Sequence, residues 1–206
     1  LVQRGRLTAA LPGEGRMLSV QAGDADLRPL VAGWPDIEVA AYNGPRQTVL
    51  SGSRASIERL GAALDAAGLR WRALQISHAF HSAFVEPALA PYAEVLAGVR
   101  FGAARCAIVN NLHGSLGGAD EMATPGYWLR QMRAPVRFAE GLQALLATGV
   151  THVVEIGPHP VLLGLAAEAA PDAAVAWLPS LRRGDDRGRD LAESLARLHA
   201  DGQRVD

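Results

Sequence analysis

The sequence predicts an α/β fold that is built in two parts. In the first part, short strand patterns and two helix patterns follow one another in the order β-α-β-β-α-β, which is typical of a small α+β unit. In the second part, single strands alternate with single helices, which indicates a parallel sheet covered by helices. A chain of 206 residues is long enough for one domain with a core and a small companion.

The small unit is predicted over residues 16–76. Its helices are expected to begin after Asp24 and Ser53, whose side chains can accept hydrogen bonds from first-turn amides, and Gly68 is expected to end the second helix. Asn43-Gly44-Pro45 is a turn signal between the two middle strands. This order is the split arrangement of ferredoxin-like domains. The strands are expected at residues 17–20, 37–41, 48–51 and 71–75.

Residues 77–178 show the alternating pattern. Thr124 followed by Pro125 predicts a helix start, and Gly149 predicts a helix end. Cys106 is expected to be a buried residue beside a strand. Residues 179–206 are charged and broken by glycine, as in a linker, with one amphipathic helix near residues 191–198. The expected helices of the larger region are 85–96, 125–132, 138–146 and 161–169, and its expected strands are 107–109, 150–156 and 173–178.

Composition excludes several functional classes. The net charge of −1 offers no attraction for nucleic acid or an anionic membrane, and no apolar run approaches the roughly 20 residues of a membrane span. No secretory signal is visible, and the single cysteine forms neither an internal disulfide nor a cysteine zinc cluster, so a cytoplasmic location is expected. Because the chain opens on Leu1 without a methionine, we expect it to be part of a longer protein.

The densest signal for chemistry is Ser77-His78-Ala79-Phe80-His81-Ser82, between the two predicted parts. A histidine can act as a general base because its usual pKa lies near 6.5. His78 and His81 are three residues apart, a spacing that could hold a metal on a helix, but no third ligand lies near them in the sequence. From spacing alone, ordinary loop histidines are the favoured interpretation.

The sequence offers no nucleophile for such a base. It contains neither a Gly-x-Ser-x-Gly turn nor a reactive-cysteine signature. Arg4 can hold a carboxylate bidentately, although most arginines are merely solvated. By default, Asn43 is a polar turn residue.

Taken together, five ordered motifs resemble the acyltransferase domain of modular type I polyketide synthases. The resemblance covers essentially the whole chain, including residues 178–183, which are similar to the linker that follows such domains. The motifs are Arg4-Gly5-Arg6-Leu7, Asn43-Gly44-Pro45 with Val49-Leu50-Ser51-Gly52, His78-Ala79-Phe80-His81-Ser82, Tyr127-Trp128-Leu129-Arg130 through Pro135-Val136-Arg137-Phe138, and Glu155-Ile156-Gly157-Pro158-His159-Pro160.

The resemblance implies a hydrolase-like large subdomain with the ferredoxin-like small subdomain, residues 16–76, inserted into it. Residues 1–15 correspond to the end of the first part of the large subdomain, residues 77–178 to its C-terminal part, and residues 179–206 to the linker. In the family's order, the nucleophilic serine precedes the Arg-Gly motif. The chain therefore resembles an N-terminally truncated acyltransferase, and alone it is expected to be inactive.

The resemblance also implies a two-step acyl transfer with malonyl-CoA as the substrate. His81 is the expected catalytic base, Arg4 the partner of the free malonyl carboxylate, and the backbone carbonyl of Gln131 the acceptor that orients the imidazole. His78, Phe80 and Asn43 are the other expected substrate contacts.

The expected acceptor is the phosphopantetheine thiol of an acyl carrier protein. The flanking ketosynthase and its linker are expected partners, whereas no nucleic acid, membrane, metal or bound cofactor is expected.

The tetrad His78-Ala79-Phe80-His81 resembles the form associated with malonyl selection. The methylmalonyl-associated form has Tyr, Ala and Ser ahead of the catalytic histidine. Phe80 in place of a small serine narrows the space beside the acyl α-carbon, and excluding one methyl group is worth roughly 10- to 200-fold in rate.

Two alternatives stay open. One is a non-catalytic interaction or docking module, because these 206 residues contain no visible nucleophile. The other is a stand-alone malonyl transacylase of fatty-acid synthesis, which shares the chemistry but needs neither the tetrad nor the trailing linker. A Gly-His-Ser-x-Gly segment before Leu1 would support the enzyme over the module.

Overall fold

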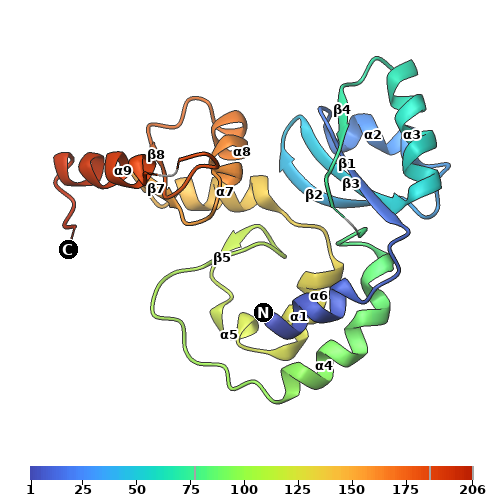
Figure 1. The fold of residues 1–206 in the computed structure, drawn as a ribbon, viewed down its shortest axis with the longest axis horizontal. Coiled ribbons are helices and arrows are strands. Elements are labelled where there is room, and N and C mark those ends of the chain that lie inside the picture. The colour runs from blue at the N-terminus through green and yellow to red at the C-terminus, as the bar shows by residue number, and fades with distance from the viewer. Residues whose placement is uncertain (77, 186, 206) are drawn as a thin grey trace. The chain divides into compact units, whose positions relative to one another are not determined.

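The structure is a computed structural model that describes residues 1–76, 78–185 and 187–205 (Figure 1). Ser77, which opens the predicted histidine segment, lies outside the described residues, as do Asp186 and Asp206 of the predicted linker. The chain divides into two compact units, Leu1–Ala144 and Leu145–Asp206, which are described separately.

A four-stranded antiparallel sheet with two helices forms the α+β part of the first unit (Figure 1). The strand order is β2-β3-β1-β4, so β2 and β4 are the edges. The chain order is β-α-β-β-α-β, as the sequence predicts. Its elements are β1 (Gly15–Val20), α2 (Asp24–Val31), β2 (Glu38–Gly44), β3 (Gln47–Ser53), α3 (Arg54–Ala66) and β4 (Trp71–Ala73).

A side-chain cap forms at only one of the two predicted helix starts. The prediction for Asp24 is wrong, because α2 follows Gly23 without a side-chain cap and the Asp24 carboxylate pairs with Arg28 instead. Ser53 Oγ accepts a hydrogen bond from the Ser56 amide (3.2 Å) and so starts α3, as predicted. Gly68 has a φ of +69°, which glycine adopts without steric cost, and it follows the end of α3. The core between helices and sheet consists of fully buried aliphatic residues, among them Leu18, Val20, Leu27, Leu50, Leu60 and Leu64.

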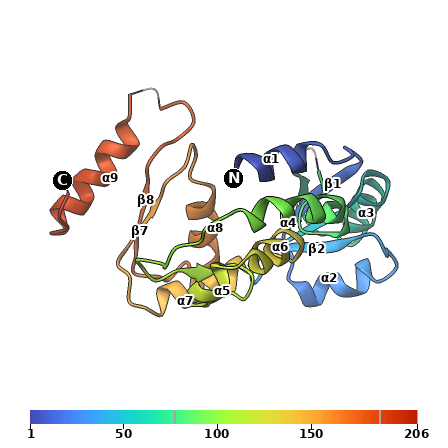
Figure 2. The ribbon, with the colours of Figure 1, turned by 90° about the horizontal axis from the view of Figure 1, so that it is seen from below.

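The rest of the first unit is mostly helical, and α1, α4 and α6 pack together (Figures 1 and 2). Pro87 lies in a 3-10 helix, η1, which replaces the start of the predicted helix 85–96. The shorter helix α4 follows it and accommodates Pro91 in its first turn. Thr124 Oγ1 accepts from the Tyr127 amide (3.3 Å), which confirms the predicted start of α6. The elements are α1 (Val2–Ala9), η1 (Ala83–Ala88), α4 (Leu89–Ala97), α5 (Ala119–Met122), α6 (Pro125–Arg133) and α7 (Phe138–Leu146), the last ending beyond the unit boundary.

The expectation for residues 106–109 is wrong. Cys106 is exposed and outside any strand, and only β5 (Val109–Asn110) forms, paired antiparallel with β6 (Ser115–Leu116) rather than within a parallel sheet. Asn110 Oδ1 accepts from the Leu112 amide (2.8 Å) and turns the chain, and Gly114 takes a φ of +65°. This local turn chemistry closes a hairpin that strand periodicity does not reveal.

The second unit contains the parallel strand pair β7 (His152–Glu155) and β8 (Ala176–Pro179), joined by α8 (Val161–Ala169) and followed by α9 (Arg189–Ala200). The Glu155 carboxylate accepts from the Leu163 amide (2.8 Å) and the Leu162 amide (3.2 Å), so the last residue of β7 caps α8. Ser194 Oγ donates to the Pro179 carbonyl (2.8 Å), and α9 packs on β8.

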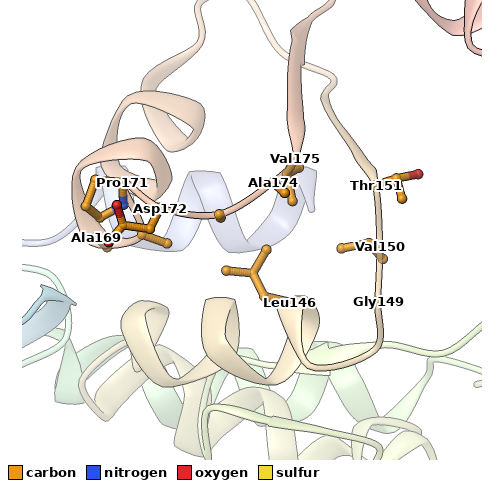
Figure 3. A pocket seen from close by; sticks show the side chains of 11 residues that line it. Leu146, Gly149, Val150, Thr151, Ala169, Pro171, Asp172, Ala174 and Val175 are labelled. Atoms are coloured by element: carbon orange, nitrogen blue, oxygen red, sulfur yellow. The ribbon is translucent and has the colours of Figure 1, made fainter.

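A cavity of about 590 Å³ lies within this second unit (Figure 3). Leu146, Val150 and Val175 line it together with the end of α8, and Asp172 is its one ionisable side chain. The cavity contains no cluster of catalytic side chains. No helix within the described residues is long and apolar enough to cross a membrane.

Candidate active site

His81 lies in the loop between β4 and η1, and its backbone is unusual. Its φ is +57°, and among the described residues no other non-glycine residue has a positive φ. Side chains with a Cβ rarely adopt this region, although His, Asn and Asp do so more than most. Such a conformation persists only where the surroundings enforce it, and it is frequent at functional sites.

A hydrogen bond defines the protonation geometry of the imidazole. His81 Nδ1 lies 2.8 Å from the backbone oxygen of Ala134, in the residue that follows α6. Because a carbonyl oxygen can only accept, Nδ1 carries the proton in the neutral ring, and Nε2 has a free lone pair. This is the tautomer in which Nε2 can take a proton from a nucleophile.

The surroundings lower the pKa of His81 below its usual value of 6.5. Burial is the largest cause, because it disfavours the imidazolium, and the positive charge of Arg4 acts in the same direction. The carbonyls of Ala134 and Gln131 oppose the shift, since they stabilise the protonated ring. At neutral pH the ring is therefore predominantly the free base.

Buried contacts on the sheet fix the loop that carries His81. Ser82 is fully buried, and its hydroxyl donates to the Ala79 carbonyl (2.8 Å) and accepts from Ser51 Oγ of β3 (3.2 Å). Ala79 is itself buried and packs directly over Gly15 of β1. The serine beside His81 is thus a structural residue rather than an exposed nucleophile.

The same sheet fixes the acceptor. Beyond Ala134, Val136 forms a parallel bridge with Ala41 of the edge strand β2. The Tyr42 amide donates to the Val136 carbonyl (2.8 Å), and the Val136 amide donates to the Ala40 carbonyl (2.9 Å). The imidazole and its acceptor are therefore both anchored to the β2–β3 pair.

Arg4 and Gln131 both come close to His81. Arg4 lies on α1, half-buried, near enough for its charge to lower the pKa of His81. Gln131 lies on α6, and its carbonyl raises the pKa of His81 less than the carbonyl of Ala134 does. The short hydrogen bond thus comes from a residue that the sequence analysis did not single out. No sequence signal could identify it, because every residue carries a carbonyl.

His78, Phe80 and Asn43 are placed less directly. His78 Nε2 lies 3.0 Å from the Leu11 carbonyl, and its ring is tilted 5.9 Å from that of Phe80. Phe80 packs against two hydrophobic clusters, one around Met132 and one around Met17. Asn43 is half-buried near the end of β2, and no described contact joins it to His81. No group of three or more His, Cys, Asp or Glu residues in the described ranges could hold a metal.

Replacing Gly15 with alanine tests how tightly the His81 loop is held. The added Cβ would lie 2.5 Å from Ala79 Cβ and 2.6 Å from the Ala79 amide nitrogen, so the loop must shift. We expect a stability loss of about 1–3 kcal/mol, measured by thermal unfolding. Gly13→Ala is the matched control, because nothing lies within 4 Å of a Cβ at Gly13. Equal unfolding temperatures for the two variants would contradict the packing argument.

Known proteins are similar to this chain in sequence and in fold. Polyketide synthase GfsA of Streptomyces halstedii is 37% identical over 206 residues, covering 98% of this chain and 3% of that protein. The acyltransferase domain from the second module of the salinomycin polyketide synthase superposes with a TM-score of 0.92 at 37% identity, covering 99% of this chain and 48% of that chain. The acyl transferase domain of SpnD, solved in complex with 2-(pent-4-yn-1-yl)malonyl, has a TM-score of 0.86 at 29% identity, covering 97% of this chain and 49% of that chain.

This chain thus spans about half the length of the solved acyltransferase chains, with which it shares a mixed α/β fold, and a small part of the curated synthase. The sequence profile of the acyl transferase domain family matches residues 1–205. The chain belongs to the acyl transferase domain family, as a domain of the polyketide synthase type.

Proposed function

We propose that this domain transfers a malonyl group from malonyl-CoA to the phosphopantetheine thiol of an acyl carrier protein, with His81 as the general base. The observation that carries the proposal is the hydrogen bond between His81 Nδ1 and the Ala134 carbonyl, which leaves Nε2 as the free acceptor, in surroundings where burial and Arg4 lower the pKa of the ring. A base of this kind is ready to accept a proton at neutral pH.

The transfer proceeds in two steps. A serine hydroxyl, expected before Leu1, attacks the thioester carbonyl of malonyl-CoA while His81 Nε2 accepts its proton. The C–S bond breaks, and the coenzyme A thiolate leaves with that proton. The carrier thiol then gives its proton to His81 and attacks the serine ester, and the serine oxygen recovers the proton.

Arg4 is the proposed partner of the malonyl carboxylate. A guanidinium presents a planar fork that suits a carboxylate, and Arg4 lies near the imidazole that would activate the nucleophile. The malonyl derivative bound to SpnD supports this class of substrate. His78, Phe80 and Asn43 are proposed as further substrate contacts.

The finer architecture belongs to the same proposal. The strand order β2-β3-β1-β4 supports a ferredoxin-like small subdomain over residues 16–76, with residues 1–15 and 77–178 contributing to a hydrolase-like large subdomain and residues 179–206 acting as a linker. The carrier protein, the ketosynthase and its linker are the proposed partners, since the relatives are polyketide synthases. A chain that lacks the nucleophilic serine should be inactive in acyl transfer. The cytoplasmic location stays a prediction.

The direct test is acyl loading of the synthase protein that carries this chain. Purified protein is mixed with labelled malonyl-, methylmalonyl- or acetyl-CoA and a carrier protein, and labelled acyl carrier is measured. Malonyl loading should exceed the other two. Absence of any acyl-enzyme and of carrier loading would contradict the proposed transfer and favour a non-catalytic module.

The double variant His78→Tyr, Phe80→Ser tests whether the tetrad determines the choice between malonyl and methylmalonyl groups. Removing the Phe80 ring should admit methylmalonyl and reduce the malonyl preference, by up to roughly the 10- to 200-fold that one methyl group is worth. Because Phe80 packs against two clusters, the variant should also unfold at lower temperature. An unchanged malonyl preference in a variant that still folds would show that the tetrad does not determine selection.

A further inference from the structure

An ion pair between Glu38 and Arg133 lies beside the candidate base, although neither residue was singled out by the sequence. Glu38 begins β2, and Arg133 ends α6, 95 residues later. Arg133 Nη1 donates to Glu38 Oε2 (2.7 Å) and Nη2 to Glu38 Oε1 (3.1 Å), which makes the pair bidentate. Arg133 Nε also donates to Glu86 Oε1 of η1 (2.8 Å).

The pair is linked to His81 from both sides. Glu38 Oε1 accepts a hydrogen bond from the backbone amide of Ala83 (2.7 Å), two residues after His81. Arg133 immediately precedes Ala134, whose carbonyl accepts from His81 Nδ1 (2.8 Å). A closed ring of short connections therefore runs from His81 through Ala83, Glu38, Arg133 and Ala134 back to the imidazole.

This cycle of contacts restricts the position of the His81 loop relative to the Ala134 carbonyl. The segment from His81 to Ala83 and the step from Arg133 to Ala134 are covalent, and the planar fork fixes the orientation of the two charged groups. Glu38 pairs with Ser51 across the sheet, and Ser51 also donates to Ser82. A shift of Arg133 would thus move the Ala134 carbonyl relative to the His81 imidazole, which that carbonyl orients.

A purely stabilising surface pair is a weaker explanation. About a third of each side chain is exposed (30% for Arg133 and 34% for Glu38), and pairs at such sites contribute little stability in general. Burial alone would lower the pKa of Arg133, but its bonds to Glu86 and Glu38 outweigh this and raise it, so the guanidinium stays charged. Arg130, one turn earlier on α6, pairs with Glu121, and that pair has no described contact with the His81 loop.

We propose that Glu38 and Arg133 are positioning residues that hold the His81 imidazole on the Ala134 carbonyl. This inference rests on the proposed role of His81 as the base. Neither residue touches the substrate in this proposal. They act by keeping Nε2 aimed at the nucleophile, and a misplacement of about 1 Å can lower a rate by about 100-fold.

The first test compares Arg133→Gln with Arg130→Gln in the synthase that carries this chain. Arg133→Gln should lower kcat for acyl transfer by about 10- to 100-fold with KM nearly unchanged, whereas Arg130→Gln should change neither. Glu38→Gln should have a smaller effect, because its amide oxygen can still accept from Ala83. Equal kcat values for the Arg133 and Arg130 variants would overturn the proposal.

A second test separates positioning from folding. Arg133→Gln is combined with His81→Asn, which removes the base. If Arg133 acts through His81, the double variant should transfer no more slowly than His81→Asn alone, and a further loss of the same size would overturn the proposal. If Arg133→Gln fails to fold, Arg133→Lys keeps the charge without the fork and should give an intermediate kcat. A kcat equal to that of the unaltered protein would then overturn the proposal.

Full activity of His81→Asn would contradict the proposed function itself, and this inference with it.

Discussion

Replacing His81 with asparagine is expected to lower the rate of acyl transfer by about 10²- to 10⁴-fold, the usual contribution of a general base. Asparagine is the informative replacement because it tolerates the left-handed backbone that His81 adopts at a φ of +57°. His81→Ala adds backbone strain to the lost base. The asparagine variant should therefore unfold close to the temperature of the unaltered protein, and the alanine variant below it.

The measurement is the rate at which labelled malonyl groups reach the carrier protein, together with thermal unfolding of each variant. His113→Asn is the matched control, because His113 is an exposed histidine paired with Glu121. This control should transfer at the normal rate. A His81→Asn variant as active as the His113 control would show that another group removes the proton.

The pH dependence of acyl transfer tests His81 independently of substitution. A ring protonated at Nε2 cannot accept a further proton, so the rate falls as pH drops through the pKa of His81. Since burial and Arg4 lower this pKa, the acid limb of kcat/KM should lie below pH 6.5, the usual histidine value. An acid limb above pH 6.5 would contradict the buried environment of the ring.

Much of the fold could be predicted because helix starts and apolar spacing depend on residues that are close together in the sequence. Ser53 and Thr124 start helices through their own side chains, and the apolar spacing of residues 138–146 and 161–169 gives the observed bounds of α7 and α8. The hairpin at Asn110 was not predicted. The apolar run at residues 107–109 indicates a longer strand, but the Asn110 side chain accepts from the Leu112 amide, turns the chain and leaves a two-residue strand paired with β6. Helix α1 was missed because it has no buried residue and no side-chain cap.

For the candidate site, sequence reasoning could single out residues only by their side-chain chemistry. The sequence singles out His81 and Arg4 by residue type and motif. It does not reveal that Ala134 holds the imidazole, because that contact uses a backbone oxygen. It also does not pair Glu38 with Arg133, since 95 residues separate two ordinary charges that only the β2–α6 arrangement brings together.

Replacing Arg4 with alanine is expected to change both selectivity and pH dependence. A hydrogen bond to a charged group is worth about 1.5–3 kcal/mol, so kcat/KM for malonyl-CoA should fall by roughly 10- to 100-fold, while that for acetyl-CoA, which lacks the carboxylate, should not fall. The positive charge of Arg4 lowers the pKa of His81. Its removal should raise that pKa, so the acid limb should move to higher pH.

Arg6→Ala is the matched control for this prediction, because Arg6 is an exposed arginine on the same helix, α1, two residues further along. The experiment measures kcat/KM for both acyl donors across pH 5–8 for the two variants. If Arg6→Ala weakens malonyl transfer as much as Arg4→Ala does, the effect is general charge attraction for an anionic substrate, not a specific carboxylate contact. If selectivity is lost without a shift of the acid limb, Arg4 binds the carboxylate but its charge does not act on His81. Selectivity between the two acyl donors reports the binding role of Arg4, whereas the position of the acid limb reports its electrostatic effect on His81. Measuring both therefore separates two roles that the single substitution Arg4→Ala removes together.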